Sequence, residues 1–188
     1  MSMERQARPV TLAWSNPVVR WWGFLSFVSA ANIAIWFALY RQFHEQSNGS
    51  FSNTSGIGLM MLLCAAYVFG CAFRSVLPRA DVQRICLFDH WLSSVMVGRT
   101  VATVAEVCFA AQWAIILHQL GTMTGAETTV NIAWTIVPLI VIAECFSWYA
   151  VLTTHYLCNA IENSIWAVVF FLVGIALCRL LPEFHGPV

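Results

Sequence analysis

The stretch from Glu144 to Glu162 reads Glu-Cys-Phe-Ser-Trp-Tyr-Ala-Val-Leu-Thr-Thr-His-Tyr-Leu-Cys-Asn-Ala-Ile-Glu, and it places ionisable side chains in a segment otherwise apolar enough for a lipid bilayer. A helix turns by about 100° per residue, so residues eleven apart point in nearly the same direction. Glu144 and His155 therefore share a face of a continuous helix, and Glu162 joins them if that helix runs on unbroken. Since a charge at membrane depth costs at least about 2.5–3.5 kcal/mol, such side chains normally face a bundle interior and mark a functional site.

The composition around this stretch is that of a membrane protein. Of 188 residues, 60% are hydrophobic and 10% are charged, whereas an average soluble domain has roughly 25% charged residues. Because one span takes about 20 apolar residues, we expect an all-α fold, an integral membrane helical bundle of about five transmembrane helices that forms a single domain over residues 1–188. The expected spans are 21–40, 57–77, 87–118, 130–155 and 164–181.

The positive charges predict an orientation and exclude some functions. All nine are Arg, and a cytoplasmic N-terminus would place six of them inside: Arg5, Arg8, Arg20, Arg74, Arg79 and Arg84. The absence of Lys excludes Schiff-base chemistry. A net charge of zero gives no basic field for nucleic acid, so the expected contacts are membrane lipids of a plasma, inner or endomembrane.

A second polar line lies in the third expected span, where Arg99 and Glu106 are seven residues apart and therefore share a helix face. Arg99 lies roughly 18 Å from the cytoplasmic start of its span, and Glu144 lies roughly 16 Å from the cytoplasmic end of the next. We therefore predict that Arg99 and Glu144 meet. Their pairing has two interpretations: an ion pair that orders the bundle, or a charge that engages a substrate.

A third set of polar residues is predicted to converge near the cytoplasmic surface: Asp89, His90, His155, Asn159 and Glu162. Carboxyl and imidazole groups are acid–base groups and also metal ligands. The chain has no HExxH or ExxH spacing, and no pair of His residues at a suitable depth for haem. The sequence therefore predicts no metal site and leaves the cofactor open.

Aromatic side chains close to Glu144 suggest a lipophilic ligand. Trp148 lies on the same stripe as Glu144, and Tyr149 follows it. Aromatic rings in membrane proteins mostly form interfacial belts, but here they could also line a cavity for a lipid, a quinone or an isoprenoid. Asn32, the one strongly polar residue inside the first expected span, is a helix-pairing residue or part of that cavity.

The favoured function is an integral-membrane enzyme that acts on a lipid-soluble small molecule by carboxylate and histidine acid–base chemistry. Glu144 or Glu162 would be the acid or base, with His155 relaying the proton and Glu106 as a second carboxylate. Two alternatives remain. One is a proton or small-solute pathway, with the relay Asp89, Arg99, Glu106, Glu144 and His155. The other is a non-enzymatic subunit or assembly factor of an oligomer or larger membrane complex, in which the polar groups specify helix pairing.

Overall fold

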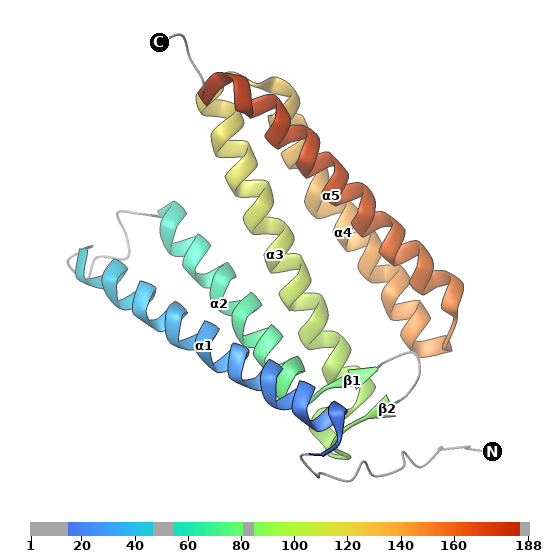
Figure 1. Ribbon diagram of the computed structural model, residues 1–188. Coiled ribbons are helices and arrows are strands. Elements are labelled where there is room, and N and C mark those ends of the chain that lie inside the picture. The colour runs from blue at the N-terminus through green and yellow to red at the C-terminus, as the bar shows by residue number, and fades with distance from the viewer. Residues whose placement is uncertain (1–14, 47–54, 81–84, 185–188) are drawn as a thin grey trace. The chain divides into compact units, whose positions relative to one another are not determined.

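The computed structural model describes residues 15–46, 55–80 and 85–184 (Figure 1). Its long elements are the helices α1 (Pro17–Gln46), α2 (Ser55–Val76), α3 (Val95–Thr124), α4 (Glu127–Thr153) and α5 (Tyr156–Phe184). A two-stranded antiparallel hairpin and one 3-10 turn lie between α2 and α3: β1 (Arg79–Ala80), β2 (Ile85–Cys86) and η1 (Trp91–Ser93). The fold is therefore all-α apart from this short connection.

Each of the five helices contains a stretch long and apolar enough to cross a membrane, the shortest being 21 residues. About 20 residues suffice for the hydrocarbon core. The chain is thus a multi-pass membrane protein, as its composition predicted. Arg5, Arg8 and Arg84 lie outside the described residues, and the cytoplasmic position of the N-terminus stays a prediction.

The chain divides into two compact units, 1–105 and 106–188, with the boundary inside α3. The organisation as a single domain stays a prediction. In the first unit α1 and α2 pack against each other. The indole Nε1 of Trp22 donates to the carbonyl of Val76 at 3.0 Å, and that of Trp36 donates to Met61 at 3.3 Å. The early part of α1 thus lies beside the end of α2, so the two helices run antiparallel.

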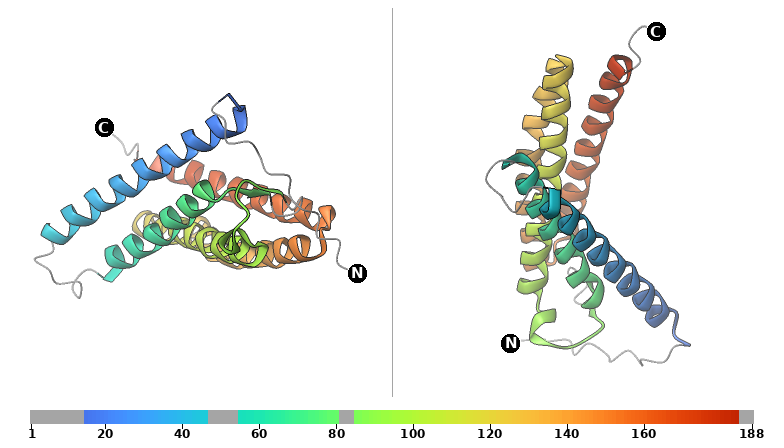
Figure 2. Two further views of the ribbon diagram at one scale, coloured as in Figure 1. Left: turned by 90° about the horizontal axis from the view of Figure 1, so that it is seen from below. Right: turned by 90° about the vertical axis from the view of Figure 1, so that its left-hand side faces the viewer.

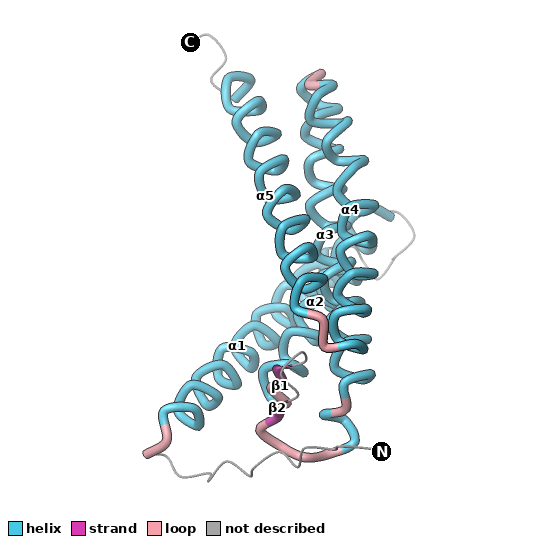
Figure 3. The backbone as a smooth tube through the Cα atoms, turned by 90° about the vertical axis from the view of Figure 1, so that its right-hand side faces the viewer, coloured by secondary structure: helices cyan, strands magenta, loops and turns pink. Residues whose placement is uncertain are grey.

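The third helix begins at Val95, later than the expected residue 87. Residues 87–94, directly before it, form a loop that contains one 3-10 turn (Figure 3). The Nδ1 of His90 accepts from the backbone N–H of Leu92, and the guanidinium of Arg79 donates to the carbonyl of Ser93. Because these bonds compete with helical ones, Asp89 and His90 lie in an exposed connection and not on a span.

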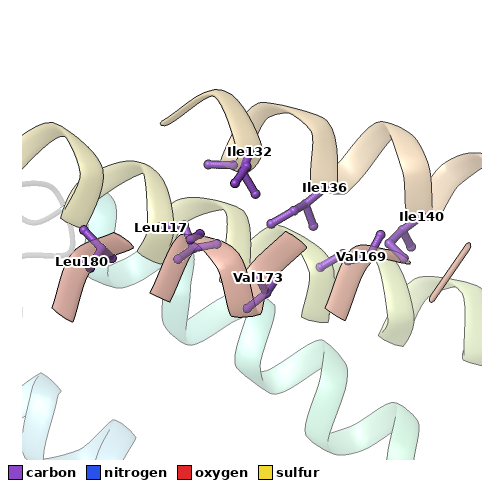
Figure 4. Close-up of a cluster of buried hydrophobic side chains, with 10 residues drawn as sticks. Leu117, Ile132, Ile136, Ile140, Val169, Val173 and Leu180 are labelled. Atoms are coloured by element: carbon purple, nitrogen blue, oxygen red, sulfur yellow. The ribbon is translucent and has the colours of Figure 1, made fainter. Parts of the chain in front are cut away.

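The second unit has a continuous apolar core formed by one side of each of α3, α4 and α5. Leu117, Ile136 and Ile140 are fully buried in it (Figure 4). Its remaining buried members are Ala110, Ile132, Ala133, Val169, Val173, Ala176 and Leu180. Between α3 and α4 the chain turns at Gly125, whose φ of 72° is a left-handed conformation that glycine adopts without steric cost.

The reversal between α4 and α5 differs from the expected one. The fourth helix ends at Thr153 and the fifth begins at Tyr156, eight residues earlier than expected, so only Thr154 and His155 connect them. Thr154 adopts a left-handed conformation (φ 57°, ψ 35°), and its backbone N–H donates to the carbonyl of Ala150. The two helices then pack side by side along their length (Figure 2). A tight turn without Gly or Pro thus replaces the continuous helix on which Glu144, His155 and Glu162 would have shared a face.

Candidate functional site

Three glutamates, each from a different helix of the second unit, form a cluster. Glu106 lies on α3, Glu144 on α4 and Glu162 on α5. One carboxylate oxygen of each lies within 4.8 Å of one from each of the others. Glu144 is 4% exposed and Glu162 is 9% exposed, whereas Glu106 is half-buried. We call Glu106, Glu144 and Glu162 the carboxylate cluster.

The α4–α5 turn brings two of these side chains together. Glu144 lies nine residues before the end of α4, and Glu162 lies six residues after the start of α5. At a rise of about 1.5 Å per residue, their backbones differ in height along the hairpin by only about 4–5 Å. A Glu side chain spans that difference. Glu162 therefore reaches Glu144 from the neighbouring helix, where the sequence had suggested a position further along the same one.

Ser147 is a buried polar residue beside the cluster that the sequence analysis did not single out. It follows Glu144 by one turn on the buried face of α4 and is 1% exposed. It lies six residues before the end of α4, the same distance from the turn as Glu162 on α5. Its hydroxyl oxygen has no hydrogen-bond partner among the described residues. The signal in the sequence was its spacing of three from Glu144, which places both side chains on one face.

Arg99 lies on α3 two turns before Glu106 and is 5% exposed. Its Nε donates to the hydroxyl of Thr103 at 3.4 Å. Arg99, Thr103 and Glu106 follow one another along one side of the helix, as the sequence spacing predicted. The pairing of Arg99 with Glu144 stays a prediction.

The predicted proton relay, His155, lies in the α4–α5 turn and is exposed, with its ring 6.3 Å from that of Tyr149. Tyr149 is itself 56% exposed. Asn159 is half-buried, and its backbone carbonyl accepts a hydrogen bond from the side chain of Asn163. These residues lie in or near the turn, and among the described His, Cys, Asp and Glu side chains His155 does not belong to the carboxylate cluster.

Most of the other predicted site residues are exposed. Asp89 and His90 are exposed in the connection before α3, and Asn32 is exposed on α1. Trp148 is half-buried on α4. Among the described residues, the predicted acid–base groups that lie close together are the three glutamates.

The chemistry of the cluster follows from its charge. Carboxylates at such short distances repel one another strongly, and the repulsion grows where water is excluded. Such a group is stable when it shares protons, pairs with a positive side chain or holds a cation. It offers oxygen ligands and groups able to accept and release protons.

Comparisons of this chain with protein-family models, with curated proteins and with solved structures found no match. Function therefore has to be argued from the site, because a fold class alone does not imply a function. The structure supports a multi-pass membrane protein with buried carboxylates from three helices.

Proposed function

We propose that this protein is an integral-membrane enzyme that acts on a lipid-soluble substrate by acid–base chemistry. The observation that carries the proposal is the meeting of three carboxylates, two of them buried, inside a bundle of apolar helices. Carboxylates are rare in such surroundings because each one costs several kcal/mol to bury, so they are generally retained for function. Helix pairing alone requires much weaker polar groups.

The acid and base roles fall on the carboxylate cluster. When neighbouring carboxyl groups share protons, one can be protonated while the next is ionised, which provides a general acid and a general base in one site. Glu144 and Glu162 are the more deeply buried pair, and Glu106 is the member nearer to solvent or lipid. His155 is exposed in the turn, so it is the weakest candidate for the relay that its sequence position suggested.

A pocket in the same unit fits an elongated, apolar substrate. Its volume is about 270 Å³, and it is lined by Ala114, Ile115, His118, Gln119, Ala133 and Trp134. Ala114 lies eight residues beyond Glu106 on α3, a distance of about 12 Å along the helix. A molecule that occupies the pocket and reaches the cluster must therefore be long, as the chain of a lipid or an isoprenoid is.

The proposal is tested by comparing the lipids of cells that express the wild-type chain with those that express Glu144→Gln. Glu127→Gln is the matched control, because Glu127 is an exposed carboxylate in the first turn of the same helix. Mass spectrometry of lipid extracts measures the abundance of each lipid relative to cells without the chain. We expect the abundance of at least one lipid to change in cells with the wild type or Glu127→Gln but not in cells with Glu144→Gln. Identical lipid profiles in cells that express the three chains at equal levels would exclude the proposed enzymatic function.

A second candidate, a proton pathway, is favoured by the polar side of α3. Arg99, Thr103 and Glu106 form a line of polar side chains along that helix, with a hydrogen bond between the first two. Lines of this kind carry protons in pumps and transporters. Proteoliposomes with an internal pH dye distinguish the two functions: a pathway acidifies the lumen under a pH gradient, and Glu106→Gln abolishes this, whereas an enzyme leaves the lumen unchanged.

A further inference from the structure

We propose that the carboxylate cluster and Ser147 together bind one hard divalent cation of the Mg²⁺, Mn²⁺ or Ca²⁺ class. The site is formed by four side chains from three helices: Glu106, Glu144, Ser147 and Glu162. All four offer oxygen atoms, which these cations prefer over nitrogen and sulfur.

The spacing of the carboxylate oxygens suits a single ion. They all lie within 4.8 Å of one another. Two ligands on opposite sides of a Ca²⁺ ion are about 4.6–5.2 Å apart, and those of Mg²⁺ are about 4.0–4.2 Å apart. The three oxygens thus fit around one ion of the larger size as they stand, and small side-chain rotations bring them to the smaller one.

Ser147 is the independent observation that points to a ligand. Its hydroxyl is buried, and it has no hydrogen-bond partner among the residues that the structure describes. A buried hydroxyl without a partner costs about 1–3 kcal/mol. Ser147 is one turn from Glu144 on the buried face of α4 and at the height of Glu162 on the neighbouring helix, so an ion bound at the cluster lies within reach of its hydroxyl. An ion held by the cluster supplies the missing partner.

The charges of the neighbouring side chains also favour a divalent ion. Arg99, two turns before Glu106 on α3, can compensate at most one of the three negative charges. Arg179 is the only arginine from residue 106 onward, and it lies seventeen residues after Glu162, about 25 Å along α5. Even with Arg99 counted in full, two negative charges remain, and a divalent cation brings the total to zero.

Ion binding at this cluster rests on the same residues as the proposed enzyme but not on its activity. A carboxylate that binds a cation through one oxygen keeps its second oxygen, which can still accept a proton. The two proposals can therefore hold together or fail separately. Bound Mn²⁺ without lipid conversion would overturn the proposed enzyme and keep the ion site, and lipid conversion by a chain that binds no Mn²⁺ would do the reverse.

The test is a titration of the purified full-length chain with MnCl₂ in detergent at pH 7, after EDTA treatment and removal of the EDTA. Free Mn²⁺ is measured by its electron paramagnetic resonance signal. We expect about one Mn²⁺ per chain, a dissociation constant raised at least tenfold by Glu144→Gln, and a smaller rise, about three- to tenfold, for Ser147→Ala. Addition of CaCl₂ is expected to displace the Mn²⁺.

Two control variants separate the site from general charge effects. Glu127→Gln removes an exposed carboxylate from α4, and Ser164→Ala removes an exposed hydroxyl from α5; both should bind Mn²⁺ as the wild type does. If Glu144→Gln fails to fold, the half-buried Glu106→Gln takes its place. The proposal is overturned if the wild type binds no Mn²⁺ at 1 mM, as expected for a cluster that only shares protons, or if the cluster variants bind it as tightly as the controls.

Discussion

The α1–α2 pair and the α4–α5 pair are both made of apolar helices, yet they bury very different side chains. Within an apolar stretch of 18 residues in each helix, 6% of residues are buried in α1 and 11% in α2, against 39% in α4 and 22% in α5. The first pair presents large side chains outward, such as Phe27 and Leu62. The second pair encloses a core and two carboxylates.

The residues that make these helices hydrophobic are therefore not the residues that form the candidate site. In the first pair two side chains of α1, Trp22 and Trp36, donate hydrogen bonds to backbone carbonyls of α2. In the second pair Glu144 and Glu162 are buried side by side. Because buried carboxylates without compensation destabilise a fold, their presence indicates a functional site. The length of the apolar helices accounts for membrane insertion in both pairs. The buried carboxylates are what distinguishes the α4–α5 pair, which holds the candidate site, from the α1–α2 pair.

The largest expected effect compares a leucine in each region. Leu117 is fully buried in the core of the second unit, whereas Leu62 on α2 is 67% exposed. Leu117→Ala leaves a cavity and should lower the free energy of unfolding by about 2–5 kcal/mol. Leu62→Ala should change it by less than about 0.5 kcal/mol. Thermal unfolding in one detergent measures both changes, and equal losses would contradict the difference in burial between the two helix pairs.

A smaller change in the free energy of unfolding is expected when glycines in the helices are replaced by alanine. A Cβ on Gly70 of α2 would lie 2.7 Å from the Cβ of Ala105, and one on Gly121 of α3 would lie 2.9 Å from a methyl group of Val130. Either Gly→Ala change should therefore cost about 1–3 kcal/mol through overpacking. Gly174 on α5 has no atom within 4 Å of such a Cβ, and Gly174→Ala should stabilise the helix by up to about 1 kcal/mol.

The same unfolding assay measures the glycine series. A loss of stability in Gly70→Ala would show that α2, although mostly exposed, still makes a close contact with α3, and a loss in Gly121→Ala would show the same for α3 and α4. A neutral Gly70→Ala would instead mean that the first unit adjusts to the added methyl group.

The smallest expected effect is at the start of α4. The hydroxyl of Thr129, fully buried, donates to the carbonyl of Ala176 on α5 at 3.5 Å. Thr129→Val keeps the shape and loses this bond, for about 0.5–1.5 kcal/mol. Thr128→Val, at the exposed neighbouring position, is the control and should be nearly neutral. An equal loss at Thr128 would show that exchanging a hydroxyl for a methyl group at the start of α4, and not the buried hydrogen bond, causes the loss.

The five helices were predictable because their apolar length exceeds what a bilayer needs, and that signal does not depend on tertiary contacts. The boundaries of two helices were not. The start of α3 depends on the hydrogen bond from Arg79 to the carbonyl of Ser93, which joins residues fourteen apart. The end of α4 depends on a left-handed Thr154, a conformation with no marker in its residue type.

The candidate site was predictable in part. Glu106, Glu144 and Glu162 stood out because carboxylates are rare in apolar segments, and that rarity is visible in the sequence. Their meeting was not visible, because it requires the turn at Thr154 and the packing of α5 on α4. His155 shared a face with Glu144 only on a helix that continues, so the turn removed it from the cluster. Ser147 carries no charge and was therefore overlooked.

The two-residue connection between α4 and α5 also has a consequence for biosynthesis. Glu144 and Glu162 are only eighteen residues apart in the chain, so they leave the ribosome close in time. A hairpin with so short a turn can enter the bilayer as one piece, and its two carboxylates then cross the headgroup region already beside each other. The helix α3, which bears Glu106, is synthesised before this hairpin. Glu144 and Glu162 would then reach Glu106 together, as a pair.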